Sequence, residues 1–289
     1  MELVLTLVGD APDAAVEALA GAGLGVKAPM VLGPGAVDIV LDGDLAQMRQ
    51  AVAAALVGHA VDACLQPAGG RRKRLLLADM DSTIINVECL DELADFAGVK
   101  AQVSAITERA MRGDLAFEAA LRERVTMLKG LPLIALEATY SQRVRLNPGA
   151  RTLVRTMAAN GARCVLVSGG FTYFTSRVAT AAGFHADRAN TLGEGEGGLT
   201  GLVSEPILGR EAKLAALQEE AAALGVALEA TLAIGDGAND LAMIEAAGLG
   251  VAYRAKAIVA ARADARVDHA DLTALLHFQG YRTDEFVTD

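Results

Sequence analysis

Polar side chains gather directly after short apolar runs at three places in the chain. The three groups are Asp79-Met80-Asp81, Ser168-Gly169-Gly170 and Gly235-Asp236-Gly237-Ala238-Asn239-Asp240. Two carboxylates at positions i and i+2 leave a strand on the same side, so one can attack while the other moves protons. A hydroxyl followed by two glycines can bring backbone N–H groups close to an anion. Carboxylate oxygens are also ligands that Mg²⁺ prefers. These residue types therefore favour chemistry on a metal-bound anion.

Each group has an ordinary interpretation when it stands alone. The pair Asp79 and Asp81 could be a surface turn or an incidental metal site, and Ser168-Gly169-Gly170 could be a plain turn from strand to helix. The segment Asp236–Asp240 could be a tight acidic turn. Lys213, near the start of a predicted helix, could be a solvated lysine. Their joint arrangement along the chain is what argues for a site.

The runs that precede the polar groups are typical of buried parallel strands. The clearest are Leu75–Ala78, Cys164–Val167, Leu232–Ile234 and Gly250–Ala252. Ligands of an open parallel sheet bind beyond the carboxyl ends of its strands, so the polar groups are expected at one edge of such a sheet. Residues 88 to 145 have a strongly helical pattern instead. The sequence predicts an α/β core with a helical insert.

Residues 2 to 66 follow a different pattern. The expected elements are a strand at Glu2–Val8, a helix at Asp13–Ala22, strands at Val26–Leu32 and Ala36–Leu41, a helix at Leu45–Val57 and a strand at Val61–Leu65. This βαββαβ order is ferredoxin-like. It resembles the ACT domain, which often binds amino acids or mediates dimerisation in enzymes of amino-acid metabolism. A packing or dimerisation role and a ligand-sensing role are both open.

A linker is predicted between the two patterns. Turn residues end at Gly70, and the four cations Arg71-Arg72-Lys73-Arg74 follow. We interpret this basic run as a solvated hinge, with contact to an anion or nucleic acid as the alternative. The expected domains are residues 1–70, the linker 71–74, and residues 75–289 with a helical cap at about 88–145.

Composition narrows the classes of function. The chain of 289 residues has 26 Lys and Arg against 36 Asp and Glu, a formal net charge of −10, which argues against general nucleic-acid binding. An anionic substrate must therefore meet local cations or a metal. The cysteines Cys64, Cys89 and Cys164 form no paired motif and favour a reducing compartment. Glu2 stands where a secretory signal carries positive charge, and no long apolar run occurs, so we expect a cytoplasmic protein without membrane contact.

Taken in order, four motifs resemble the haloacid dehalogenase superfamily over residues 75 to about 280. They are D-x-D-x-T at Asp79, S-G-G at Ser168, the basic residue Lys213 and G-D-G-x-N-D at Gly235. Within that superfamily the segments Asp79–Glu88 (DMDSTIINVE), Phe117–Arg124 (FEAALRER) and Val167–Phe171 resemble the phosphoserine phosphatase family. The resemblance implies a Rossmann-like core with a helical cap. It also implies Mg²⁺-dependent hydrolysis of O-phospho-L-serine, the last step of serine biosynthesis.

The resemblance implies a role for each motif residue. Asp79 attacks phosphorus and forms an aspartyl-phosphate, and Asp81 gives a proton to the leaving serine and later takes one from water. Ser168, the Gly169 N–H and Lys213 hold the phosphoryl group. The metal ligands are the Asp79 and Asp236 carboxylates and the Asp81 carbonyl. Asn239 and Asp240 support the metal, Lys213 or the phosphoryl pocket.

Substrate choice is expected to come from the cap. Phosphoserine carries an ammonium and a carboxylate, and Glu88 and Arg124 match the family positions that contact those groups. Glu88 could instead be a helix-start acid, and Arg124 an exposed base. Met111 and Phe117 either line the closed cap and exclude water or belong to an ordinary core.

Two further functions are open on the sequence. The aspartyl-phosphate could pass its phosphoryl group to another alcohol, which would make the protein a phosphotransferase. The chain could also be an amino-acid sensor whose phosphatase half is degenerate. The strand edges of the ferredoxin-like domain make a homodimer plausible.

Overall fold

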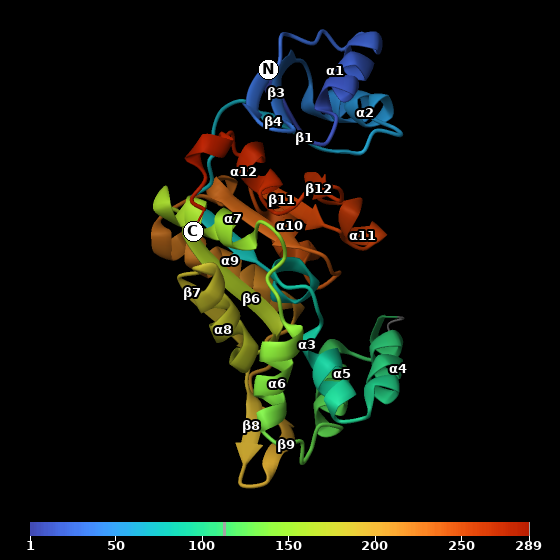
Figure 1. Ribbon diagram of the computed structural model, residues 1–289, viewed down its shortest axis with the longest axis vertical. Coiled ribbons are helices and arrows are strands. Elements are labelled where there is room, and N and C mark those ends of the chain that lie inside the picture. The colour runs from blue at the N-terminus through green and yellow to red at the C-terminus, as the bar shows by residue number, and fades with distance from the viewer. Residues whose placement is uncertain (112–113, 289) are drawn as a thin grey trace.

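The computed structural model describes residues 1–111 and 114–288, with a four-stranded, a six-stranded and a two-stranded sheet. The four-stranded sheet and its helices lie at one end of an elongated molecule, the six-stranded sheet lies in the middle, and a helical part lies at the other end (Figure 1). No helix among the described residues is long and apolar enough to cross a membrane.

The N-terminal part has the ferredoxin-like arrangement that the sequence predicts. Its elements are β1 (Glu2–Gly9), α1 (Pro12–Gly21), β2 (Met30–Gly33), β3 (Ala36–Asp42), α2 (Leu45–Ala55) and β4 (Val61–Pro67). The strands are antiparallel in the order β2-β3-β1-β4. Pro12 opens α1, and Asp44 caps α2 by accepting from the N–H groups of Ala46 and Gln47. Strand β2 begins later than predicted, because Pro29 has no N–H to donate to the sheet.

The core is a six-stranded parallel sheet in the order β12-β11-β10-β5-β6-β7. Its strands are β5 (Leu75–Ala78), β6 (Arg163–Phe171), β7 (Ala186–Asn190), β10 (Thr231–Gly235), β11 (Leu249–Tyr253) and β12 (Ala265–Val267). In β5, Leu76 packs in one buried cluster and Leu75 and Leu77 in the other, so alternate side chains serve both faces. The continuous apolar run predicted for a buried parallel strand is confirmed.

Helices cover both faces of this sheet (Figure 1). One face packs against α7 (Ala150–Ala159), α8 (Thr172–Ala182) and α12 (Ala274–Phe278). The other packs against α9 (Arg210–Leu224), α10 (Leu241–Ala246) and α11 (Ala257–Ala260). The α/β class with a parallel sheet is therefore confirmed.

The insert after β5 is helical, as predicted, and it gains a hairpin. The cap helices are α3 (Cys89–Phe96), α4 (Lys100–Met111), α5 (Phe117–Thr126) and α6 (Ile134–Arg143). The hairpin of β8 (Leu192–Gly195) and β9 (Gly198–Val203) joins them through two backbone hydrogen bonds, Gly130 N–H to Leu199 O and Leu199 N–H to Leu131 O. The glycine-rich sequence of this hairpin is typical of a turn, so its pairing with the cap was not predicted.

The interpretation of the basic run as solvated is wrong for Arg71 and Lys73, whereas Arg72 and Arg74 are exposed. The Arg71 side chain is 12% exposed and donates to both oxygens of Asp38 and to Thr6 Oγ1. Lys73 is buried, and its ammonium group donates to the carbonyls of Gly70 and Glu229. Buried acceptors need donors, and this basic run supplies them. The division of the chain at residues 71–74 stays a prediction.

The N-terminal sheet is also joined to the core by one buried carboxylate. Asp62, on β4, accepts from the backbone N–H groups of Asp268, His269 and Ala270 at 2.7–3.2 Å. We expect Asp62→Asn to lower the free energy of unfolding by roughly 1–3 kcal/mol, because one acceptor oxygen becomes a donor facing N–H groups. Urea unfolding checks this, with exposed Asp13→Asn as the matched control. Equal stability of the two variants would show that the contact contributes nothing.

Candidate active site

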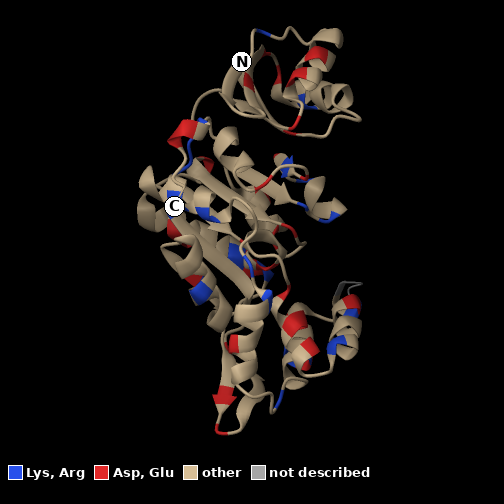
Figure 2. Cartoon of the chain, viewed as in Figure 1, with Lys and Arg blue, Asp and Glu red and all other residues tan. Residues whose placement is uncertain are grey.

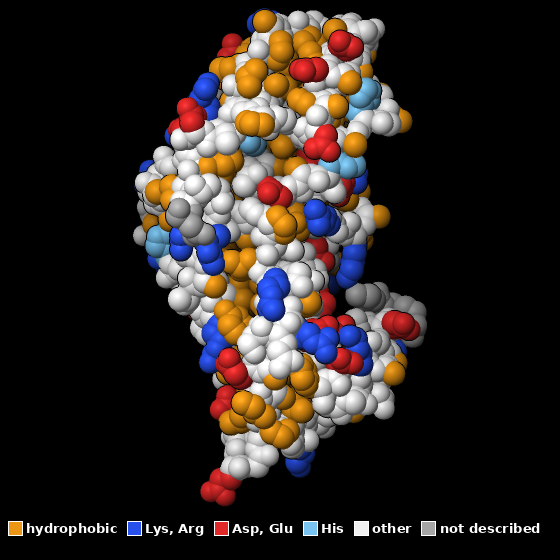
Figure 3. Space-filling view, viewed as in Figure 1, with side chains coloured by type: hydrophobic (Ala, Val, Ile, Leu, Met, Phe, Trp, Pro, Cys, Tyr) orange, Lys and Arg blue, Asp and Glu red, His pale blue; other side chains and the backbone are white. Residues whose placement is uncertain are grey.

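The three polar groups meet at one edge of the parallel sheet. Strands β10, β5 and β6 are neighbours, and Asp236 and Asp79 directly follow β10 and β5. Ser168 lies near the carboxyl end of β6, which runs on to Phe171 instead of ending at Val167 as predicted. Charged residues of both signs lie where the core faces the cap (Figure 2), and charged side chains border a hollow between these two parts on the surface (Figure 3). The edge predicted from the strand ends is therefore where these side chains converge.

A tight turn after β5 sets the directions of the first two carboxylates. The Asp79 N–H donates to the carbonyl of Ile234 on β10, and the chain then turns through Met80–Ile84. Asp81 is held from two sides: Ser168 Oγ donates to its Oδ2 at 3.1 Å, and the Cys89 N–H donates to its Oδ1 at 2.9 Å. Burial and the nearby Glu88 charge raise the pKa of Asp81 to about 7.

Gly170 packs closely against the side chains of Asp81 and Ser168. A Cβ built on it would lie 3.0 Å from both Asp81 Oδ2 and Ser168 Oγ. Its N–H donates to Ser168 Oγ at 2.8 Å, which fixes the hydroxyl. A larger residue here would displace the two side chains that the sequence places in the site.

A buried ammonium group stands at the centre of the acidic cluster. Lys213 Nζ lies 2.5 Å from Asp79 Oδ1 and 2.5 Å from Asp240 Oδ1, and the lysine side chain is 1% exposed. Burial alone would lower the pKa of Lys213, but the charges of Asp240 and Asp79 raise it above the ordinary range. The interpretation of Lys213 as a solvated helix lysine is therefore wrong.

The donor set at this edge fits a divalent cation. Carboxylate oxygens of Asp79, Asp236 and Asp240 lie within 4.8 Å of one another. Three carboxylates against the single ammonium of Lys213 leave negative charge, and hard oxygen donors suit a divalent metal. Burial and the charge of Asp240 raise the pKa of Asp236 to about 6, as expected for a carboxylate crowded by others. The Asp81 carbonyl as a ligand stays a prediction.

Asn190 was missed by the sequence argument and belongs to the same edge. It is 2% exposed and ends β7. Its Nδ2 donates to the carbonyls of Gly169 and Leu208, and its Oδ1 accepts from the Leu208 N–H at 2.7 Å. This side chain joins the glycine segment after Ser168 to the segment that leads into α9 and Lys213. A polar residue at the end of a fourth parallel strand was the available signal.

Two of the predicted cap residues, Glu88 and Arg124, lie at the start of α3 and on α5. Glu88 lies just before α3, and its charge adds to burial in raising the pKa of Asp81 and Asp236. Arg124 is half-buried on α5 and donates to Thr107 Oγ1 at 3.3 Å and to a backbone carbonyl of its own helix. Burial lowers the pKa of Arg124, although the charges of Asp91 and Glu88 act in the opposite direction.

Phe117 brings the cap onto the core. A Cβ built on Gly169 would lie 3.2 Å from Phe117 Cζ, so the ring covers the glycine segment. Asn239 is half-buried after β10, against Gly237. The side chain of Met111 lies outside the part of the chain that the structure describes. The roles of all these residues in binding stay predictions.

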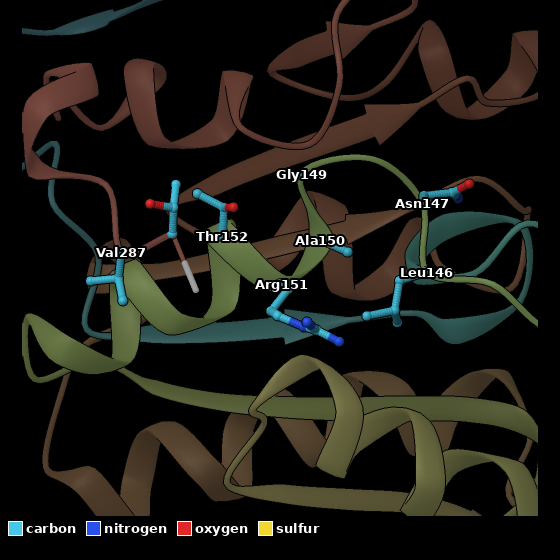
Figure 4. A pocket seen from close by; sticks show the side chains of 8 residues that line it. Leu146, Asn147, Gly149, Ala150, Arg151, Thr152 and Val287 are labelled. Carbon is cyan, nitrogen blue, oxygen red and sulfur yellow. The ribbon is translucent and has the colours of Figure 1, made fainter.

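Two pockets lie away from the acidic cluster. The pocket in Figure 4 has a volume of about 280 Å³ and lies at the start of α7, beside Asn147, Arg151, Thr152 and Val287. A second pocket, of about 250 Å³, lies between α6, α8 and β8. Neither pocket is lined by a residue of the acidic cluster, so the chemistry of the side chains locates the candidate site.

Comparison with known proteins supports a functional site at this edge of the sheet. The family of haloacid dehalogenase-like hydrolases matches residues 76–245, which contain β5, β6, β10 and the acidic cluster. The chain belongs to this family. Phosphatases of this family generally need a divalent metal, and the acidic cluster fits that need.

Individual proteins are similar to the chain beyond the segment that the family matches. The chain is 42% identical over 234 residues to a phosphoserine phosphatase of Archaeoglobus fulgidus, covering 80% of this chain and 68% of that one. A haloacid dehalogenase family hydrolase of Salmonella enterica serovar Typhi has a TM-score of 0.88 at 28% identity and covers 96% of this chain and 98% of its own. A structure described as a phospho-aspartyl intermediate analogue of phosphoserine phosphatase has a TM-score of 0.67 at 39% identity, over 72% of this chain and 99% of that one.

Proposed function

We propose that this protein is a phosphoserine phosphatase, which hydrolyses O-phospho-L-serine to L-serine and phosphate with Mg²⁺ as its cofactor. The observation that carries the proposal is the buried Asp79–Lys213–Asp240 cluster beside the hydrogen-bonded pair of Asp81 and Ser168. Such a cluster provides a nucleophile, an acid and a cation at one sheet edge. The relatives named phosphoserine phosphatase support the choice of substrate.

In the first step, a carboxylate oxygen of Asp79 attacks phosphorus, and the bond from phosphorus to the serine oxygen breaks. Asp81 gives its proton to that departing oxygen, so serine leaves neutral at its hydroxyl. The hydrogen bond from the Cys89 N–H holds Asp81 in place for this transfer. The product on the enzyme is an aspartyl-phosphate at Asp79.

In the second step, Asp81 accepts a proton from water as the water oxygen attacks phosphorus. The bond between Asp79 and phosphorus breaks, which restores the free carboxylate and releases phosphate. Transfer to another alcohol instead of water would give the phosphotransferase that the sequence leaves open.

The phosphoryl group is held by its neighbours in both steps. Ser168 Oγ, the Gly169 N–H and the Lys213 ammonium group donate to its oxygens. Mg²⁺, when bound by Asp79, Asp236 and the Asp81 carbonyl, would neutralise phosphoryl charge. Asp240 fixes Lys213, and Asn239 supports the phosphoryl pocket from the adjacent turn. Phe117 and Met111 exclude water from the closed site.

Arg124 is proposed to bind the substrate carboxylate and Glu88 its ammonium group. We expect Arg124→Lys to lower kcat/KM for phosphoserine roughly tenfold or more, because lysine keeps the charge but loses the two-pronged contact. The value of kcat/KM for phosphoethanolamine, which has no carboxylate, should fall far less. Steady-state kinetics on both substrates check this. Arg122→Lys, at an exposed position of the same helix, is the matched control. Equal losses on both substrates would contradict the assignment.

The whole proposal is tested by phosphate release from the purified chain with Mg²⁺. O-Phospho-L-serine should be preferred over phosphothreonine, a sugar phosphate and an aryl phosphate. Equal cleavage of all four substrates would support hydrolysis of phosphomonoesters but contradict the preference for phosphoserine. Phosphorylated alcohol in place of free phosphate would identify a transferase, and tight serine binding without any turnover would identify a sensor.

We propose a packing role for the N-terminal domain, which resembles the ACT domain. The buried contacts of Arg71 and Asp62 with the core support this role over that of a freely moving sensor. The three free, buried cysteines support a cytoplasmic location. A homodimer stays a prediction from the sequence.

A further inference from the structure

Ser82 has an unusual backbone for its residue type. It lies between Asp81 and Thr83 in the turn after β5, with φ at 58°, in the left-handed region that glycine adopts more easily. Arg254 is the other residue besides glycine with positive φ in the described part of the chain. This conformation is strained for a serine and persists only where surrounding contacts hold it.

The Ser82 hydroxyl donates to Glu88 Oε1 at 2.6 Å. The Ser82 N–H donates to the Val87 carbonyl, so the turn is folded back onto the start of α3 through both backbone and side chain. This hydrogen bond uses one oxygen of the Glu88 carboxylate, and the second oxygen can still accept from a ligand. Glu88 is thus fixed to the same turn that carries Asp79 and Asp81.

Glu88 needs such a partner because its side chain is exposed and long. A free glutamate at this place would have to be immobilised each time it bound an ammonium group, at a cost in conformational entropy. The Ser82 hydroxyl restricts the carboxylate in advance. Among the described residues, no other side chain is found to hydrogen-bond to Glu88.

We propose that Ser82 determines specificity: its hydroxyl preorganises the Glu88 carboxylate for the substrate ammonium group at a fixed distance from the attacking Asp79. This inference rests on the proposed function, because it takes an aminated phosphomonoester as the substrate. Ser82 acts through Glu88 and is therefore a positioning residue. Its effect should appear only with substrates that carry the ammonium group.

The test compares O-phospho-L-serine with 3-(phosphonooxy)propanoate, the same molecule with hydrogen in place of the ammonium group. The quantity measured is the ratio of kcat/KM for the two substrates, since general damage to the turn lowers both values together. For Ser82→Ala the ratio should fall about three- to tenfold, the range expected for losing one restricted side chain. Ser82→Gly fits the left-handed backbone without strain and should lower the ratio by the same factor.

A double-mutant cycle locates the effect on Glu88. In a Glu88→Gln background, Ser82→Ala should change the ratio less than about twofold. An unchanged ratio in both Ser82 variants, different ratios for alanine and glycine, or a full effect in the Glu88→Gln background would each overturn the inference. Failure of the proposed function is separate, because the wild-type chain would then not prefer phosphoserine over its deaminated analogue.

Discussion

Asp79→Asn is expected to lower kcat for phosphate release from phosphoserine by at least roughly 10⁴-fold, because the amide cannot form the aspartyl-phosphate. The fold should survive the change. Lys213 keeps its contact with Asp240, and one of three crowded carboxylates loses its charge. Phosphate release and the melting temperature check the two parts of this prediction.

The matched control for Asp79→Asn is Asp13→Asn, which makes the same chemical change at an exposed position of α1. It should keep wild-type kinetics. Mg²⁺ should also raise the melting temperature of the wild-type chain more than that of Asp79→Asn. A ligand that binds the folded state more tightly stabilises it more, and the variant has lost one carboxylate ligand. Substantial activity in Asp79→Asn would remove Asp79 as the nucleophile and with it the covalent mechanism.

Lys213→Met is expected to damage both activity and stability. Methionine fills a similar volume but leaves Asp79 and Asp240 buried without their common cation. Losing one partner of a buried ion pair costs roughly 3–5 kcal/mol of unfolding free energy. We also expect kcat/KM to fall about 10³-fold, because the developing phosphoryl charge loses a fixed donor. Urea unfolding and steady-state kinetics measure the two effects.

The pH dependence of the Lys213 contribution has a definite sign. The pKa of Lys213 is raised above the ordinary lysine value, so its stabilisation is fully present at neutral pH and is lost only as pH rises through the raised value. Lys213 itself therefore adds no pH dependence between pH 6 and 8. Lys213→Met, however, removes the charge that opposes the raised pKa of buried Asp79, so the difference in stability between the wild-type chain and Lys213→Met should grow as pH rises. Lys129→Met, at an exposed cap position, is the control. Equal stability of the two variants would contradict the buried role.

Local patterns predicted the parts of the site that follow strands. Asp79, Ser168 and Asp236 each come directly after an apolar run, and parallel strands bring their carboxyl ends together. Lys213 could be expected at the site from the family resemblance alone. Its burial depends on Asp79, 134 residues away, so no helix pattern could show it.

Contacts made by single residues over long distances escaped prediction. Asn190 lies in no motif, and its partners are Gly169 and Leu208. The basic run at Arg71 appeared solvated because its acceptors, such as Asp38, come from distant segments. Charge in a sequence indicates exposure only when no buried acceptor requires it.

If Asp79 carries the phosphoryl group during turnover, that group can be trapped on the protein. Phosphoserine labelled with radioactive phosphorus is mixed with the enzyme and Mg²⁺, quenched in acid within one turnover and digested to peptides. Label is expected on the peptide that contains Asp79. It should be lost on chasing with unlabelled substrate and be absent in Asp79→Asn. Label on the peptide that contains Ser168, or turnover with no labelled peptide at any time, would contradict this role of Asp79.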